Sequence, residues 1–340
     1  MKLIRVFPRK TKATPTDALA FIGEPSLFST ADRVHISVAF TWDLPEAERL
    51  YGLWRHIAPT DIGGPATGNK SGDFIPGLYL KKGYVITSRG CPNHCWFCSV
   101  WRREGELREL PITEGFNVLD DNFLSCSDKH IKDVFTMLEK QKNKPQFTGG
   151  LEPQKIKQWH IDEMLRLKTH KMFFAYDGPE DREPMFQAGK MLQASGVTLN
   201  SWIPHAYCLI GYPGDTIDGA EKRLIECLEF GFIPMAMLYR DNSGKRSIEW
   251  ARFQTTWARP AIIYVKHRKY WGSKMECLAD CWICKKKKNC RCDNPCPHVF
   301  DGRDCRMKNV CNPKRKKCPL IKASIEGPEL FNYDGEVING

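Results

Sequence analysis

Three cysteines lie within eight residues of one another, at Cys91, Cys95 and Cys98. This C-x3-C-x2-C spacing lets a single loop bring three thiolates to one metal centre, whereas four ligands complete an iron–sulfur or structural zinc site. A centre held by three cysteines therefore keeps one coordination position open, and open positions are where metal chemistry occurs. The alternatives are a structural zinc knuckle or cysteines that are buried as small hydrophobic residues.

The composition of the chain favours a globular protein of a reducing compartment. Of its 340 residues 42% are hydrophobic, which is ample for a packed core, and no apolar run reaches the roughly 20 residues that cross a bilayer. Because the first residues carry lysine and arginine without an apolar segment, we expect no signal peptide, a cytoplasmic location and no membrane contact. The 15 cysteines are then expected to bind metal in preference to forming disulfides.

The last part of the chain differs from the rest in composition. Residues 271–320 contain 13 Lys or Arg against 5 Asp or Glu, so they contribute +8 to an overall net charge of +11. Nine of the cysteines lie in the same part of the chain, namely Cys277, Cys281, Cys284, Cys290, Cys292, Cys296, Cys305, Cys311 and Cys318. We interpret this change as a boundary between a core and a metal-stabilised region at 266–325, followed by a tail at 326–340.

The nine cysteines of this region could form one or two four-thiolate sites around which it folds. Zinc and an auxiliary iron–sulfur cluster both fit such sites, and the spacing does not choose between them. Two basic runs, 285–288 and 314–317, interleave with the cysteines and would attract phosphate groups. The region is therefore a candidate nucleic-acid-binding surface, with a merely solvated basic tail as the alternative.

Upstream of this region, apolar strand-like segments alternate with helical patterns. A small α/β unit is expected in residues 1–77, because an alternating strand at 34–40 precedes a helix at 44–57. From residue 78 to 265 the pattern predicts six strand–helix units, with strands near 78–87, 117–123, 146–151, 172–176, 202–210 and 234–239. We expect Asp128 to cap the helix after the second strand. Such units form a parallel sheet with helices outside it, and six of them fall short of the eight that close a full barrel.

Polar and glycine residues follow the predicted strands at the points where they end. In chain order they are Cys91, Cys95, Cys98, Asp120, Asp121, Asn122, Gly149, Gly150, Glu152, Asp177, Gly178, Gly211, Asp215, Arg240 and Asp241. Because the carboxyl ends of parallel strands share one edge of a sheet, we expect these residues to lie close together. Adjacent carboxylates repel each other, so Asp120 and Asp121 are catalytic candidates, through a raised pKa or substrate binding. The alternative is that one of them caps a helix or pairs with an arginine such as Arg89.

The cysteine spacing, with Phe97 directly before the last cysteine, resembles the signature of the radical S-adenosylmethionine (SAM) enzymes. Residues 78–265 resemble the core of this family, an open six-stranded partial barrel of the TIM type. The stretch 1–265 is similar to uncharacterised iron–sulfur oxidoreductases of bacteria and phages, in which the first part corresponds to a reduced cobalamin-binding-like region. The Asp-x-His-x-x-Gly motif of cobalamin binding is missing, so the resemblance does not extend to bound cobalamin.

The resemblance implies a 4Fe–4S cluster held by Cys91, Cys95 and Cys98, whose free iron is chelated by SAM. It also implies that residues at the later strand ends bind the amino group, ribose and adenine of SAM. The residues concerned are Phe97, Gly149, Gly150, Glu152, Asp177, Ile210 and Gly211. The family usually has Gly-Gly-Glu, whereas Leu151 is inserted before the glutamate here. Each of these glycine- and aspartate-containing segments could also be an ordinary turn.

The resemblance further implies that SAM is cleaved reductively to a 5′-deoxyadenosyl radical, which abstracts hydrogen from a substrate. The electron would come from a donor of the flavodoxin or ferredoxin type. The basic region of the chain favours a nucleic acid or a nucleotide as the substrate. Two alternatives stay open: a methylthiotransferase-like insertion of sulfur supplied by a cluster in the tail, and a non-enzymatic, metal-stabilised nucleic-acid-binding protein.

Overall fold

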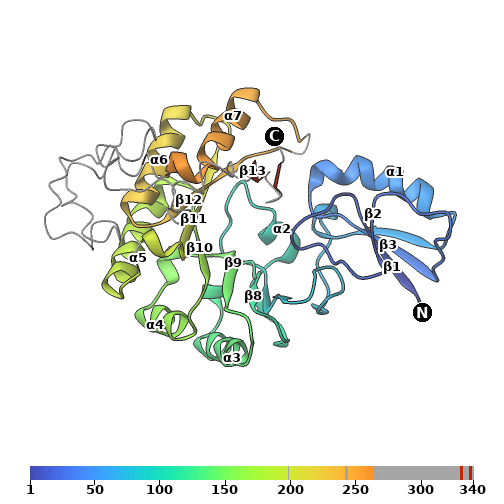
Figure 1. The fold of residues 1–340 in the computed structure, drawn as a ribbon, viewed down its shortest axis with the longest axis horizontal. Coiled ribbons are helices and arrows are strands. Elements are labelled where there is room, and N and C mark those ends of the chain that lie inside the picture. The colour runs from blue at the N-terminus through green and yellow to red at the C-terminus, as the bar shows by residue number, and fades with distance from the viewer. Residues whose placement is uncertain (198, 242–243, 264–265, 267–329, 332–336, 339–340) are drawn as a thin grey trace, which may run out of the picture.

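The structure, a computed structural model, is a mixed α/β protein built on two parallel sheets (Figure 1). The described residues are 1–197, 199–241, 244–263, 266, 330–331 and 337–338. The α/β class predicted from the sequence is therefore confirmed. The metal-stabilised region predicted at 266–325 lies outside the described residues apart from Lys266, together with all nine of its cysteines.

The N-terminal part of the chain forms a four-stranded sheet. Its strands run parallel in the order β2-β1-β3-β4. Their bounds are Leu3–Phe7 for β1, Ala20–Ile22 for β2, Arg33–Ser37 for β3 and Thr60–Gly63 for β4. Helix α1, Leu44–Trp54, packs on this sheet through Leu50 and Trp54, and the Trp54 indole N–H donates to the Gly23 carbonyl at 3.0 Å. The strand and helix expected near 34–40 and 44–57 are therefore present.

The apolar pattern does not predict β1, because Arg5 interrupts it. Arg5 is nevertheless only 5% exposed, since its guanidinium donates to the carbonyl oxygens of Gly77 and Leu78, at 3.1 and 2.8 Å, and pairs with Asp17. A buried charge is tolerated when its donors are satisfied in this way. Arg5 thereby ties the four-stranded sheet to the segment that leads into the second sheet.

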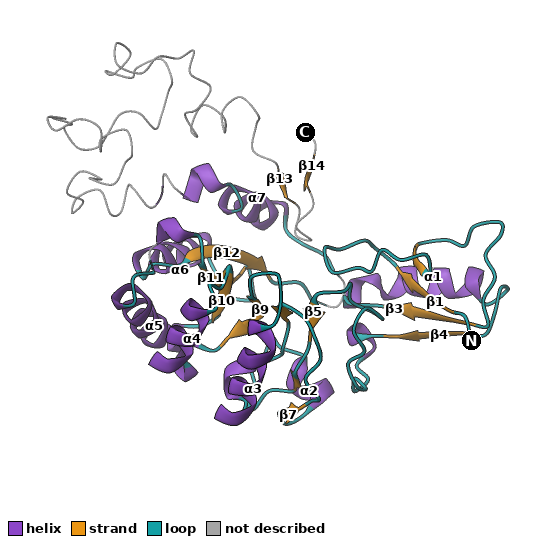
Figure 2. Cartoon of the chain, turned by 60° about the horizontal axis from the view of Figure 1, so that its bottom comes forward, coloured by secondary structure: helices purple, strands orange, loops and turns teal. Residues whose placement is uncertain are grey.

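The second sheet has six strands, all parallel, in the order β12-β11-β10-β9-β8-β5 (Figure 2). Their bounds are Tyr84–Val85 for β5, Asn117–Val118 for β8, Gln146–Leu151 for β9, Lys171–Tyr176 for β10, Pro204–Ile210 for β11 and Ile233–Leu238 for β12. The first two strands are shorter than predicted. Thr87, expected in the first of them, donates its N–H to the Asp120 carboxylate and not to a neighbouring strand.

Two short antiparallel pairs complete the sheets of the described residues. Strand β6 pairs with β7, and β13 pairs with β14. Their bounds are Ser88–Arg89 for β6, Arg108–Glu109 for β7, Leu330–Phe331 for β13 and Val337–Ile338 for β14. The first pair encloses both the cysteines at 91–98 and the helix that follows them, so this part of the chain begins and ends at neighbouring points.

Helices connect the strands of the six-stranded sheet, and Figure 1 shows α3 to α6 along its outer side. Their bounds are Val100–Glu104 for α2, Asp128–Glu139 for α3, Gln158–Arg166 for α4, Arg182–Ala194 for α5, Ile217–Glu229 for α6 and Ile248–Trp257 for α7. The predicted cap of α3 is wrong: the Ser127 hydroxyl, and not Asp128, accepts the His130 N–H at 3.2 Å. Among the described helices, none combines the length and apolar character that crossing a membrane requires.

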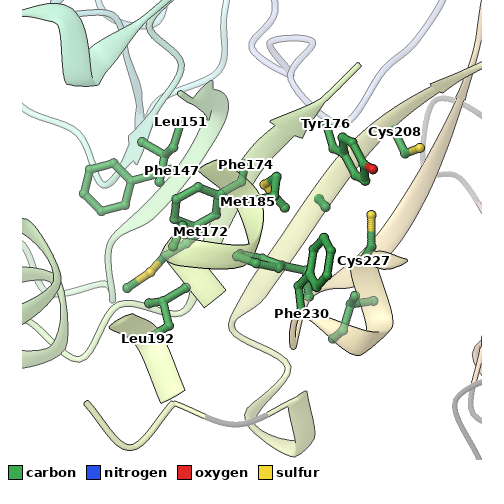
Figure 3. Packing of buried hydrophobic residues seen from close by; sticks show 14 of the residues in the cluster. Phe147, Leu151, Met172, Phe174, Tyr176, Met185, Leu192, Cys208, Cys227 and Phe230 are labelled. Atoms are coloured by element: carbon green, nitrogen blue, oxygen red, sulfur yellow. The ribbon is translucent and has the colours of Figure 1, made fainter. Parts of the chain in front are cut away.

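Two hydrophobic clusters hold these elements together. One comes from the four-stranded sheet and α1, and the other from the six-stranded sheet and the helices around it. Figure 3 shows Phe147, Met172 and Phe174 of neighbouring strands beside Met185 and Leu192 of α5. Two clusters agree with two folding units, whose boundary near residue 77 stays a prediction.

Helix α5 approaches the chain that follows α6 closely at Gly189. A Cβ atom at this position would lie 2.1 Å from the carbonyl oxygen of Phe230, which is closer than real Cβ contacts. We therefore expect Gly189→Ala to lower the free energy of unfolding by about 1–3 kcal/mol, although alanine has the higher helix propensity. Urea denaturation of the purified protein measures this change.

Gly52 in α1 provides the matched control, because nothing lies within 4 Å of a Cβ built at this helical position. Gly52→Ala should raise the free energy of unfolding by up to about 1 kcal/mol. The two substitutions are therefore expected to change the free energy of unfolding in opposite directions. Equal effects would contradict the close approach at Gly189.

Candidate functional site

The carboxyl ends of the six parallel strands meet at one edge of the sheet, as their common direction requires. The segment 91–98, called the cysteine loop below, follows β5 at one side of this sheet. Its Trp96 contacts Tyr212, which follows β11, and Tyr239, which follows β12, with ring centroids 5.7 and 5.6 Å apart. The cysteine loop therefore reaches the ends of strands at the other side of the sheet.

Asn122, at the end of β8, connects the cysteine loop to β9. Its side-chain amide donates to the Cys91 sulfur at 3.3 Å and to the Glu152 carboxylate at 2.7 Å. Its buried Oδ1 has no hydrogen-bond partner among the described residues. The sequence places Asn122 at the end of the second predicted strand, beside Asp121, but predicts no role for it. A buried amide oxygen without a donor is a place where a bound ligand could donate.

The sulfur atoms of the cysteine loop accept further N–H groups of the backbone. Cys91 accepts from the Asn93 N–H and Cys98 from the Val100 N–H, both at 3.4 Å. Burial and the neighbouring thiols of Cys98 and Cys91 raise the pKa of Cys95 to about 11, and burial raises the pKa of Cys98. The Cys95 and Cys98 thiols are therefore protonated at neutral pH, and a bound cation is what would convert them to thiolates.

As placed, no three His, Cys, Asp or Glu side chains within the described part of the chain converge closely enough to hold a metal ion. The donor set itself suits a metal: three thiols lie on one loop, and N–H groups point at the sulfurs of Cys91 and Cys98. Hydrogen bonds of this kind tune iron–sulfur clusters and other thiolate-bound metals. The residues therefore fit a metal centre in chemical type, and binding would have to draw the three sulfurs together.

The chain leaves the cysteine loop through α2, whose last residue, Glu104, is buried. Its carboxylate pairs with Arg103 at 2.9 Å and with Arg108 at 2.8 Å, and it accepts the Ser71 hydroxyl at 2.6 Å. Burial alone would raise the pKa of Glu104, but these hydrogen bonds and charges outweigh it and lower the pKa to about 2. Glu104 therefore fixes the end of the loop to β7 and to the segment before β5.

Asp120, a predicted catalytic residue, is 1% exposed and fully engaged. Its carboxylate accepts the Thr87 N–H and the Thr87 hydroxyl at 2.6 Å, and the Ser88 hydroxyl at 2.7 Å. Burial raises the pKa of Asp120, and these hydrogen bonds offset the rise only in part. Asp120 therefore ties the end of β8 to the residues that follow β5, and its burial favours a positioning role. Catalysis by Asp120 stays a prediction.

Asp121, the second carboxylate of this pair, faces the start of the cysteine loop. It accepts the Gly90 N–H at 2.9 Å, and its other oxygen lies 3.9 Å from the Arg89 guanidinium. The ion pair with Arg89, which was the alternative to a catalytic role, is therefore present. Burial raises the pKa of Asp121, and the Gly90 N–H and Arg89 oppose this rise.

Gly149 and Gly150 form a bulge in β9, where one residue of β10 lies opposite three residues of β9. Gly150 has a φ of +103°, which favours glycine, and a Cβ at Gly149 would lie 2.1 Å from the carbonyl oxygen of Asp120. The inserted Leu151 completes the strand with its side chain in the core, 1% exposed. Glu152 then follows at the carboxyl edge. Bulges beside functional sites redirect the chain in this way.

Asp177 follows β10 and interacts electrostatically with the cysteine loop, because its charge raises the pKa of Cys95 and of Cys98. Burial and the nearby carboxylate of Asp181 raise the pKa of Asp177 to about 7. Asp181 is held in place by the N–H groups of Asp177 and Gly178, at 2.9 and 3.1 Å. Asp177 is therefore a carboxyl group that can gain or lose a proton near neutral pH.

The remaining predicted cofactor residues have mainly packing contacts. Ile210 is fully buried in the core of the six-stranded sheet. Gly211 has a φ of +70°, and its N–H donates to the Asp215 carboxylate at 2.8 Å. Phe97 packs edge-on against Trp96, with ring centroids 5.5 Å apart. Contacts of Ile210, Gly211 or Phe97 with a cofactor stay predictions.

Comparison with protein-family models gives no match for this chain. A search of curated protein sequences gives no significant match either. Any function must therefore be argued from the residues and the geometry given above. Zinc or iron–sulfur binding by the nine cysteines of the tail, which lie outside the described residues, stays a prediction.

The raised pKa of Asp177 predicts a pH-dependent effect of its removal. The pKa rises from an ordinary value of 3.8 to about 7 in the folded protein, so ionisation increasingly favours the unfolded protein as the pH rises between these values. Asp177→Asn should therefore change Tm little near pH 3.8. Above about pH 7 the variant should have a higher Tm than the unmodified protein. Thermal unfolding across this pH range measures the difference.

Asp73, which is exposed, provides the control for this measurement. Asp73→Asn should shift Tm by a small amount that stays constant across the same pH range. If the effect of Asp177→Asn were equally constant, the shifted ionisation of Asp177 would be disproved.

Proposed function

We propose that this protein is a radical SAM enzyme that acts on a nucleic acid or a nucleotide. The observation that carries the proposal is a three-cysteine loop at the carboxyl edge of a six-stranded parallel sheet, in contact with strand ends at both sides. Parallel strands in chain order also support a partial barrel as the finer description of this core. The resemblance of the cysteine spacing to the family signature is the second support.

In this proposal Cys91, Cys95 and Cys98 hold a 4Fe–4S cluster and leave one iron for SAM. When bound, the cluster supplies the low-potential electron that cleaves SAM to a 5′-deoxyadenosyl radical, and a flavodoxin- or ferredoxin-type protein supplies it in turn. The residues of the chain hold the ends of the loop, through Asp120 at its start and Glu104 at its end. Fixed ends keep the three thiols above the same strand ends in every molecule.

The strand ends beside the loop would bind SAM. The Gly149–Gly150 bulge has no side chains to block the approach of the methionine part to its backbone. Asp177 lies at the end of the neighbouring strand, where its carboxylate could accept hydrogen bonds from ribose hydroxyls. Glu152 is held beside Cys91 by Asn122, which suits a role near the amino group. Ile210 and Gly211 would support the adenine.

An aromatic rim favours a substrate that contains a base. Trp96 is 52% exposed and lies between Tyr212 and Tyr239 at the carboxyl edge of the sheet. An exposed indole at such a place offers a face on which a base can stack, and one such contact is worth about 1–3 kcal/mol. This rim supports a nucleotide or nucleic acid as substrate independently of the basic tail.

Anaerobic reconstitution with iron and sulfide tests the proposal. The reconstituted protein should form 5′-deoxyadenosine from SAM when dithionite is added, and Cys91→Ala should reduce this product to background, because the cluster would lose a ligand. Chromatography of the quenched reaction measures the product. An intact reconstituted cluster that releases no 5′-deoxyadenosine would disprove the proposed function.

Cys227→Ala provides the matched control for Cys91→Ala. Cys227 is fully buried in the core cluster and takes no part in the cysteine loop, so its loss should leave product formation intact. Iron content alone is a weaker readout, because the cysteines of the tail are expected to bind metal as well. A sulfur-inserting enzyme would be recognised by labelled sulfide that appears in the substrate.

The amide of Asn122 predicts a shift in the reduction potential of the proposed cluster. Because its N–H donates to the Cys91 sulfur at 3.3 Å, it would stabilise the more negative, reduced state. Asn122→Ala should therefore lower the midpoint potential, measured by a redox titration followed by electron paramagnetic resonance. Ser125→Ala is the control, since Ser125 donates to Glu152 at 3.3 Å without contacting a sulfur. Equal potentials for Asn122→Ala and Ser125→Ala would exclude this role of Asn122.

A further inference from the structure

An open groove of about 450 Å³ lies along α7. Three arginines line it, Arg246, Arg252 and Arg259, and the rest of its lining is Ile248, Ala251, Thr255 and Thr256. The two threonine hydroxyls donate to backbone carbonyls of α7, at 2.8 and 2.9 Å. This groove is separate in residues from the cysteine loop and from the proposed SAM site. The charged groups of its lining are all guanidiniums, which bind oxyanions.

The groove lies on one side of α7 because of helical spacing. Arg252, Thr255 and Arg259 recur at intervals of three, four and seven residues, which place them along one face of the helix and its C-terminal extension. The opposite face holds the buried Trp257 in the core cluster, and Gln254 donates to the Ala236 carbonyl of β12 at 3.0 Å. The inner face of α7 is thus fixed on the sheet, and its arginine face points away from the sheet.

The segment that carries this groove is positively charged. Residues 244–263 carry four Lys or Arg and one Asp or Glu in sequence. No carboxylate of the described residues forms an ion pair with Arg246, Arg252 or Arg259. Guanidinium groups that have no ion pair among the described residues are donors that phosphate oxygens can accept.

We propose that the arginine face of α7 binds the phosphate backbone of a nucleic acid. A single phosphate would not need this length, because Arg252 and Arg259 are about 10 Å apart at a rise of 1.5 Å per residue. The positive charge also continues along the chain, since residues 266–288 contain eight Lys or Arg and two Asp or Glu. An extended polyanion is the partner that matches both the length and this continuity.

The choice of a nucleic acid as the partner of α7 rests in part on the proposed function. The arginine face of α7 would hold the substrate backbone, while the aromatic rim at the strand ends would bind a base. The binding measurement needs neither a cluster nor SAM. Failure of the inference is therefore distinguishable from failure of the radical SAM proposal.

The test is the binding of a fluorescently labelled, single-stranded RNA to the full-length protein, followed by anisotropy at several salt concentrations. The double substitution Arg252→Gln/Arg259→Gln should weaken binding roughly tenfold or more near 0.1 M salt. It should also reduce the slope of log K against log salt by about 1.4, because each lost phosphate contact to a single strand accounts for about 0.7.

The control is Arg55→Gln/Lys140→Gln, which removes the same charge from two other exposed positions. This double variant should keep the affinity and the slope of the unmodified protein. Equal losses of affinity in the two double variants would show that only the overall charge of the protein matters, and this would overturn the proposal.

A second outcome would assign the groove to another occupant. Residues 321–340 contain four Asp or Glu and one Lys, so this acidic segment is a competing partner for the arginines. In that case Arg252→Gln/Arg259→Gln would lower Tm and leave RNA binding unchanged, and the proposal would be overturned. Formation of 5′-deoxyadenosine without substrate should be the same in both double variants.

Discussion

The arrangement of the candidate site depends on one buried carboxylate, that of Asp120. It accepts three hydrogen bonds from Thr87 and Ser88, at 2.6 to 2.7 Å, while the backbone carbonyl of Asp120 packs against Gly149. Leaving any of these buried donors without an acceptor would cost about 1–3 kcal/mol. Because the donors directly precede the cysteine loop, the end of β5, the end of β8 and the bulge of β9 can only move together.

The cysteine loop is consequently held at both of its ends. Asp120 and Asp121 hold its start, and Glu104, paired with Arg103 and Arg108, holds its end. Between these points the loop touches the rest of the carboxyl edge through the amide of Asn122 and the ring of Trp96. Fixed ends suit a loop that must bring three thiols to one metal, as the proposed function requires. The arginines of α7 are not among the residues that form this arrangement, although Trp250 of the same helix packs against Gly211.

Much of the fold can be predicted from local patterns along the chain. Strands β9 to β12 lie within two residues of their predicted bounds, because apolar runs between turn residues are a local property. Strand β1 escapes such prediction, since Arg5 is buried only through carbonyl groups more than 70 residues away. The candidate site likewise has features that the sequence predicts and features that it does not. The spacing of the cysteines is visible in the sequence, whereas the role of Asn122 depends on Glu152, 30 residues later, and on Cys91, 31 residues earlier.

The sequence by itself determined which chemical groups are present and the order in which they follow the strands. It places three thiols on one loop, carboxylates after β8, β9 and β10, and six strand–helix units that must form a parallel sheet. Only the tertiary structure decided which of these groups are available. The Asp120 carboxylate is fully hydrogen-bonded by Thr87 and Ser88, and the Ile210 side chain is buried in the core. The pKa of Asp177, by contrast, rises to about 7, so this group can still exchange a proton. The physical reason is burial, which depends on residues brought from elsewhere in the chain and which sets both the hydrogen bonds and the ionisation of each group.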